Sequence, residues 1–138
     1  PGMVFANLYN GQGYDLVLVR QVEPTRLNLD EVADRLKRPE YAPVVKSLGE
    51  IGMHSVTDLF GTFAGQAPDF APWLKDAQIN RDRKLRLQYL AGRGLNLYRA
   101  DSIYSDMASY GAEPNEIFQG STELQAALMQ QIRGAKAH

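Results

Sequence analysis

The first 22 residues have the apolar pattern of two strands joined by a tight turn. Asn10-Gly11 is a pair that favours the positive φ angles of a hairpin turn. The residues that follow the glycines, Asp15 to Val19, are mostly β-formers and make a poor start for a helix. A phosphate-binding loop would instead lead into a helix, whose free N–H groups hold the anion. The pattern therefore predicts a β-hairpin over residues 1–22.

The second strand of this hairpin is apolar at consecutive positions, from Leu16 to Val19. Because side chains alternate between the two faces of a strand, the strand would be apolar on both faces, as inside a larger sheet. A two-stranded hairpin is marginal by itself, and the chain begins Pro1-Gly2 without an initiator methionine. We therefore expect residues 1–138 to be a single C-terminal domain or fragment of a larger protein.

Residues 23–138 are predicted to be mostly helical, which makes the fold class α+β, a hairpin followed by about six helices. The predicted helices cover about residues 29–38, 43–51, 55–65, 68–74, 94–111 and 121–134. The residues placed as N-caps or as helix stops are Asn28, Ser55, Ser121, Gly52, Gly65 and Gly134. Residues 79–94 alternate as a strand does, although their residue types favour a helix, and we expect an extended segment there.

Composition and charge exclude several classes of function. The chain has 15 Lys+Arg and 16 Asp+Glu, and this balance argues against a dedicated nucleic-acid binder. It has no cysteine, which excludes disulfides and thiolate metal sites, and its two histidines are too far apart for a zinc site. No segment reaches the roughly 18 to 20 apolar residues that span a bilayer, and no signal peptide is visible. We expect a cytoplasmic protein without a metal.

Three segments carry a likeness to a known family. They are MVFANLYNGQGYDLVLV (3–19), RLNLDEVADRLKRPEYAPVVKSLGEIGMHSVTDLFGTF (26–63) and QINRDRKLRLQYLAG (78–92). Together they resemble the C-terminal part of spermidine-synthase-like proteins, closest to the bacterial subgroup in which that domain is fused to membrane helices. The resemblance implies that the hairpin ends a Rossmann-like methyltransferase sheet and that a helical region follows it.

Individual residues match the family pattern in part. Val4 and Phe5 match the opening of the first strand, with Ala6 in place of the usual proline, and residues 15–19 match the second strand. Asn80 and Asp82 fall where the family has an asparagine and an aspartate, and a matching tyrosine follows at Tyr89. Two acidic groups of the family motif are lost here, because Arg83 stands where the family has its second aspartate and Gln88 where it has a glutamate. Arg81 replaces a threonine.

The resemblance implies a part of an aminopropyltransferase that is not catalytic alone. In the family, the glycine-rich loop that holds decarboxylated S-adenosylmethionine lies upstream, as do the catalytic aspartates. This chain would therefore bind no cofactor itself, complete the sheet and cover the amine-substrate cleft of its parent. The implied partners are an upstream Rossmann-like domain, or a second copy of the chain through the hairpin edge. A polyamine ligand and a parent at the cytoplasmic face of a membrane are also compatible with the resemblance.

Asn80, Asp82 and Tyr89 are the candidate substrate-binding residues, and no catalytic residue is assigned. A carboxylate and an amide could hold and orient an ammonium group, and a tyrosine ring could face it. The simpler interpretation is that Asn80 and Asp82 turn or cap the chain and that Tyr89, like Trp73, belongs to a core.

A second class of function remains open. The chain could be a non-enzymatic helical module that binds another protein through apolar helix faces. The two faces that would serve are Leu59/Phe60/Phe63 and Leu124/Leu128/Ile132.

Overall fold

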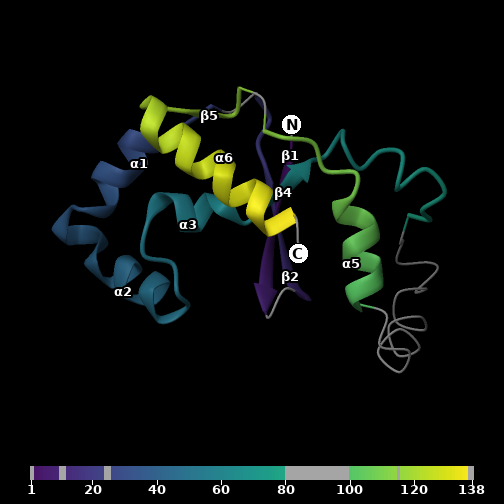
Figure 1. Cartoon of the computed structure of the whole chain (residues 1–138), viewed down its shortest axis with the longest axis horizontal. Helices are drawn as coiled ribbons and strands as arrows, with labels where there is room; N and C mark the ends of the chain where they lie inside the picture. Colours follow the sequence, from purple (N-terminus) through teal and green to yellow (C-terminus); the bar gives the residue numbers. More distant parts are fainter. Residues whose placement is uncertain (1, 10–11, 24–25, 80–99, 115, 137–138) are drawn as a thin grey trace.

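The computed structural model of the chain describes residues 2–9, 12–23, 26–79, 100–114 and 116–136 (Figure 1). Within them the fold is mixed α+β, with one three-stranded antiparallel sheet, one short parallel strand pair and five α-helices. The predicted fold class is confirmed at this level, and the helix number is close to the predicted one.

The N-terminal hairpin forms as predicted. Strand β1 (Gly2–Tyr9) pairs antiparallel with β2 (Gln12–Arg20). The register places Val4 opposite Leu18 and Phe5 opposite Val17, with one irregularity after Asn7. The first strand therefore presents alternate residues to the two sides of the sheet.

A third strand, which the sequence did not indicate, completes this sheet. Strand β4 (Phe63–Gln66) pairs antiparallel with the other side of β1, so that the strand order is β2-β1-β4. The helix predicted over 55–65 is therefore shorter, since α3 covers only Val56–Gly61. Pairing with β1 satisfies the backbone of residues 63–66 and buries Phe63 and Ala64, which outweighs the weak helical preference of a short segment.

Gly65 is a point of close approach within β4 and not the helix stop that the sequence predicted. A Cβ atom added there would lie 2.7 Å from Cζ of Phe70 and 3.0 Å from Cα of Gly111. Both neighbours leave little room, because Phe70 is buried and the atom of Gly111 belongs to the backbone. Only glycine fits at this position.

The helix predicted over 68–74 is wrong. Residues 67–76 form consecutive turns, with bonds from Ala71 N–H to the Pro68 carbonyl (3.1 Å) and from Leu74 N–H to the Phe70 carbonyl (2.9 Å). Pro72 explains the difference, because it has no N–H to donate and disfavours helical φ/ψ at the residue before it.

The other helices are close to their predicted positions. They are α1 (Leu29–Leu36), α2 (Ala42–Glu50) after the 3₁₀ turn η1 (Pro39–Tyr41), α5 (Ala100–Ala108) and α6 (Thr122–Lys136). Asn28 caps α1, Ser55 caps α3, and Gly52 follows α2 with a φ of 80°. Gly134 does not end α6, which continues to Lys136. The predicted start of α5 lies outside the described residues, as does all of the segment that we expected to be extended except Ile79.

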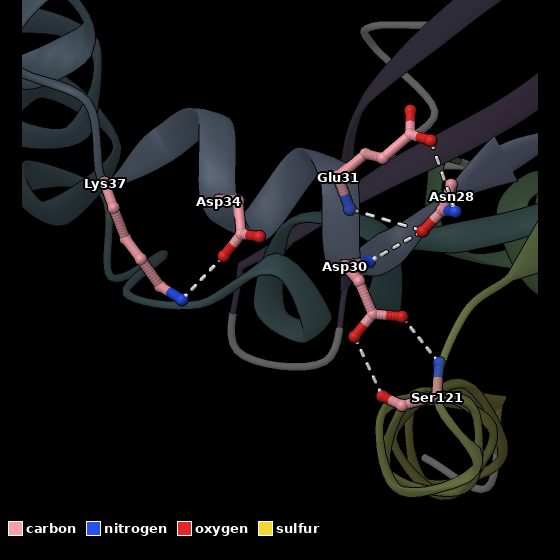
Figure 2. Close-up of polar contacts among 6 residues, drawn as sticks. All are labelled: Asn28, Asp30, Glu31, Asp34, Lys37 and Ser121. Carbon is pink, nitrogen blue, oxygen red and sulfur yellow. Dashed lines mark hydrogen bonds and ion pairs between the residues drawn. The ribbon is translucent and has the colours of Figure 1, made fainter.

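A parallel strand pair joins α1 to α6. The strands are β3 (Leu27–Asn28), which runs directly into α1, and β5 (Phe118–Gln119), which Gly120 and Ser121 connect to α6. As Figure 2 shows, both carboxylate oxygens of Asp30 then accept bonds from Ser121, one from its N–H (2.6 Å) and one from its hydroxyl (2.9 Å). Gly120 has a φ of 143°, and a Cβ atom there would lie 2.7 Å from Asp30. This contact holds together two helix starts that are 91 residues apart.

The sheet separates two apolar cores. We call the first the helix-side core; its buried members are Leu29, Val56, Phe63, Ile117, Phe118, Leu128 and Ile132. The second, the α5-side core, contains Val4, Ala6, Ala64, Phe70 and Met107. Figure 1 shows α5 on one side of the sheet, with α1, α2 and α3 on the other. Alternate residues of β1 enter the two cores, since Met3 and Phe5 pack against the first while Val4 and Ala6 belong to the second.

Candidate functional site

The three substrate-binding residues predicted from sequence lie outside the described residues. Asn80, Asp82 and Tyr89 all belong to the segment 80–99. Their assignment therefore stays a prediction. Trp73, which the sequence placed in a core, is partly buried and packs against the α5-side core.

Among the residues whose exposure the structure describes, the longest run of exposed apolar side chains lies on β2. Leu16 is 47% exposed, Val17 54%, Leu18 78% and Val19 38%, and we call these four residues the β2 strip. The residues opposite them on β1 include Val4 and Ala6, which are 5% and 2% exposed. Neighbouring strands of similar composition thus differ sharply in how far they are covered.

The β2 strip is apolar on both faces of the sheet. Residues directly opposite each other in an antiparallel pair point to the same face. Leu16 and Leu18 therefore share the face of Ala6 and Val4, while Val17 and Val19 share that of Phe5 and Met3. This is the two-sided pattern that the sequence predicted, here on a strand whose side chains are exposed.

β2 also forms an open edge. In the part of the chain that the structure describes, β2 pairs only with β1, and its other side has no strand beside it. An edge strand presents backbone donors and acceptors that can pair with a further strand. Combined with side chains that are apolar on both faces, this edge is suited to extend the sheet and to pack under further layers.

A mostly apolar groove of about 460 Å³ lies between α1, α2 and the start of α3. Its polar lining consists of Lys37, His54 and Ser55. Nζ of Lys37 lies 2.9 Å from Oδ1 of Asp34 (Figure 2), and this exposed ion pair raises the pKa of the lysine and lowers that of Asp34. The Lys37 ammonium of this groove is thus already paired, within its own helix end.

Ser55 caps α3 as predicted, and the backbone N–H of His54 takes part in the same capping. Asp58 N–H donates to the Ser55 hydroxyl (3.0 Å), and the Asp58 carboxylate accepts from His54 N–H (2.9 Å). The same carboxylate accepts from the side chain of Gln131 on α6 (3.0 Å). The bond from Gln131 is the main reason that the pKa of Asp58 lies below its ordinary value. These bonds stabilise the α3–α6 contact.

Neither a metal centre nor a membrane-spanning helix is found in the described residues. No group of three or more His, Cys, Asp or Glu side chains gathers there in a way that could hold a metal ion. No helix among them is both long enough and apolar enough to cross a bilayer.

Comparison with known proteins gives no family assignment. No family model matches the chain, and no curated protein or solved structure matches it either. The resemblance to spermidine-synthase-like proteins therefore stays a prediction from the sequence segments quoted above.

Sequence reasoning missed one arrangement of polar and aromatic side chains. Nε1 of Trp73 donates to Oδ2 of Asp106 at 2.9 Å, and both residues line a cavity beside α5. The spacing of Ser102, Ile103 and Asp106 places them on one helix face and could have been noticed. Their neighbour Trp73 is 33 residues from Asp106 in sequence and comes from a segment that was predicted as a helix.

Proposed function

We propose that this chain is the C-terminal subdomain of a spermidine-synthase-like transferase. In this proposal β1 and β2 complete the sheet of an upstream Rossmann-like domain, and the helical part covers the cleft for the amine substrate. The chain is not catalytic alone, and decarboxylated S-adenosylmethionine is bound by the upstream part of the parent.

The β2 strip is the observation that supports this proposal. Fully burying a valine or leucine side chain is worth about 1.5 to 3 kcal/mol, so four exposed residues forgo several kcal/mol of stabilisation. A strand with this composition becomes favourable when another strand pairs with its edge and further layers cover both faces. The family likeness places such a neighbour upstream of the hairpin.

The alternative function, a helical interaction module, was suggested by two apolar helix faces. In the structure these faces are mostly packed inside the chain. Phe63, Leu128 and Ile132 are almost completely buried in the helix-side core, and Phe60 and Leu124 pack against the same core. The rings of Phe60 and Phe63 also contact that of Phe118, tilted in the first pair and edge-to-face in the second, with centroids 5.3 and 5.6 Å apart. Both faces are thus occupied within the chain, and no observation on the described residues favours this alternative.

The proposal is tested by sequencing and expressing the complete reading frame. We expect a glycine-rich loop after a strand and an acidic pair about a hundred residues before Pro1. The complete protein should transfer an aminopropyl group from decarboxylated S-adenosylmethionine to an amine, and the present chain alone should show no turnover. An unrelated upstream region, or turnover by the present chain, would overturn the proposal.

Matched substitutions test the role of the β2 strip. In the complete protein, Val17→Asn and Leu18→Asn should reduce turnover and expose β2 amides to hydrogen exchange, because they place amides in a covered sheet. Val22→Asn is the control, since Val22 is 99% exposed and follows the strand. Equal effects at Val22 and in the strip would show that β2 contacts nothing upstream.

A further inference from the structure

Residues 39–53 comprise η1, α2 and the turn that follows α2, and none of them is buried. We call this segment the strap. It carries apolar side chains all the same, since Val44 is 48% exposed, Val45 41% and Ile51 64%. Among the described residues that form or flank the two cores, none comes from the strap. Because a helix as short as α2 is marginal in isolation, the strap would gain stability from a surface to pack on.

Both ends of the strap have the backbone of a hinge. At its start, Arg38 is extended (φ −74°, ψ 143°), and Pro39 has no N–H with which to continue the helical bonds of α1. At its end, Gly52 has a φ of 80°, and a Cβ atom added there would meet no neighbouring atom within 4 Å. Changes in φ and ψ are absorbed at a few such positions where elements end. The strap can therefore turn as a unit between these two points.

The hydrogen bonds of the strap are local. Tyr41 N–H donates to the Arg38 carbonyl (3.0 Å), and Met53 N–H donates to the Leu48 carbonyl (2.9 Å). The next residue, His54, already takes part in the cap of α3. Between the described residues, no hydrogen bond joins the strap to α3 or α6. A rotation of the strap would therefore leave the bonds of those helices intact.

An apolar groove of about 460 Å³ lies between the strap and the body that α1, α3 and α6 form. Val45, Leu48 and Met53 line it on the strap. On the body, Val56 belongs to the helix-side core and Leu124 packs against that core. Figure 1 shows α2 at the outer end of the helical part, with α3 between it and the sheet. Two apolar walls thus face one groove, and only the wall on the body is anchored in a core.

We propose that the strap closes onto α3 and α6. In the closed position Val45 and Leu48 pack against Val56 and Leu124, and most of the groove is eliminated. Burial of these side chains favours closure, and the loss of hinge freedom opposes it. A strap with these two positions controls whether the groove is accessible. The device is independent of the β2 strip, on which the proposed function rests.

Relaxation-dispersion NMR on the isotope-labelled chain tests for the two positions, because it detects the μs–ms exchange that is typical of hinge motions. We expect the amides of residues 40–53 to share one exchange process and the amides of residues 130–136, at the far end of α6, to show none. A strap without dispersion, or one process common to the strap and to residues 130–136, would overturn the proposal.

Val45→Asp and Val44→Asp distinguish closure from fraying of α2. Both valines are about half exposed in the observed position, so both variants should fold. Val45 lines the groove, whereas Val44 is not part of its lining. Only an aspartate at position 45 would have to lose its water in the closed position, which is costly for a charge. We expect Val45→Asp to abolish the exchange and Val44→Asp to retain it, and equal effects of the two changes would contradict closure.

A cysteine pair tests the direction of the motion. The chain has no cysteine, so Val45→Cys with Leu124→Cys can form one intramolecular disulfide in dilute solution, provided that the two Cα atoms come within about 7 Å. Lys46→Cys with Leu124→Cys is the control, because Lys46 is the next residue of α2 and is not part of the groove lining.

In a glutathione buffer the first pair should cross-link at least about tenfold faster than the control, since the rate follows the effective concentration of the two thiols. The dispersion of the strap should vanish once the disulfide has formed. Equal rates in the two pairs, or dispersion that persists in the cross-linked chain, would show that the strap moves without closing on α6 and would refute the proposal.

Discussion

The two edge strands of the main sheet, β4 and β2, flank the same central strand and have opposite surroundings. Phe63, Ala64 and Gly65 of β4 are buried, because the helix-side core covers one face and the α5-side core the other. β2 has a longer run of apolar residues, and its side chains are exposed from Asp15 to Arg20. The covered strand is thus the less hydrophobic of the two. Burial here follows the position of the covering elements and not the apolar content of the strand.

The surroundings of β4 are packed by elements of the chain itself, whereas the outer edge of β2 has no neighbouring strand. Around β4, the rings of Phe5, Phe60, Phe63 and Phe118 contact each other with centroid distances from 5.3 to 6.2 Å. Around the outer edge of β2, the described chain provides no strand. In the isolated chain, substitutions around β4 should therefore lower the free energy of unfolding more than substitutions on β2 do.

The largest expected effect is in the helix-side core. Leu128→Ala should lower the free energy of unfolding by about 2 to 5 kcal/mol, because Leu128 is buried and its truncation leaves a cavity. Leu18→Ala on β2 is the matched control and should change it by no more than about 0.5 kcal/mol. Urea denaturation measures both. Equal costs would mean that β2 is as well covered as the core, for example by a second copy of the chain, and sedimentation would reveal that copy.

The next effect concerns the contact between α1 and α6. Asp30→Ala should cost about 1.5 to 3 kcal/mol, because it removes two hydrogen bonds to a charged acceptor and leaves the N–H of Ser121 without its partner. Asp34→Ala, on the exposed face of the same helix, should change the thermal midpoint little. If the two variants melt alike, the contact that Figure 2 shows contributes nothing to stability.

A smaller effect is expected from the close approach at β4. Gly65→Ala should cost about 1 to 3 kcal/mol, since the new methyl group would overlap Phe70 and the backbone of Gly111. Gly134→Ala is the control, because no atom lies within 4 Å of its added Cβ and the residue is helical. It should be neutral or stabilise the chain by up to about 1 kcal/mol. Thermal melting of the pair decides whether β4 is as tightly packed as described.

The smallest effect is a dependence on pH. Since the pKa of Asp58 is lowered in the folded chain, its bonds contribute stability above the ordinary aspartate pKa, and this contribution is lost as the pH falls through the folded value. Stability measured below about pH 4 should therefore fall less steeply in Asp58→Asn than in the parent chain. If the free energy of unfolding depended on pH identically in the two proteins, the bond from Gln131 would not favour the ionised form of Asp58.

Features that depend on neighbours within about four residues could be predicted from the sequence. The cap of α1 at Asn28, the cap of α3 at Ser55 and the turn at Gly52 depend on local hydrogen bonds and backbone preferences, and all three were found. The hairpin was predictable for a similar reason, since a run of β-forming residues after an Asn-Gly turn pair indicates two adjacent strands. The prediction that β2 is apolar on both faces also follows from alternation alone.

Only the tertiary structure decided the features that depend on distant residues. Phe63 is in a strand because β1 lies beside it, and β3 meets β5 across 91 positions, so neither could be found from local pattern. The same holds for Trp73 and Asp106, whose separate segments form one cavity. Sequence by itself determined which residues are apolar, where α1 and α3 are capped and that β2 is apolar on both faces. The tertiary structure decided which of those residues are covered, because burial is set by elements that arrive from elsewhere in the chain.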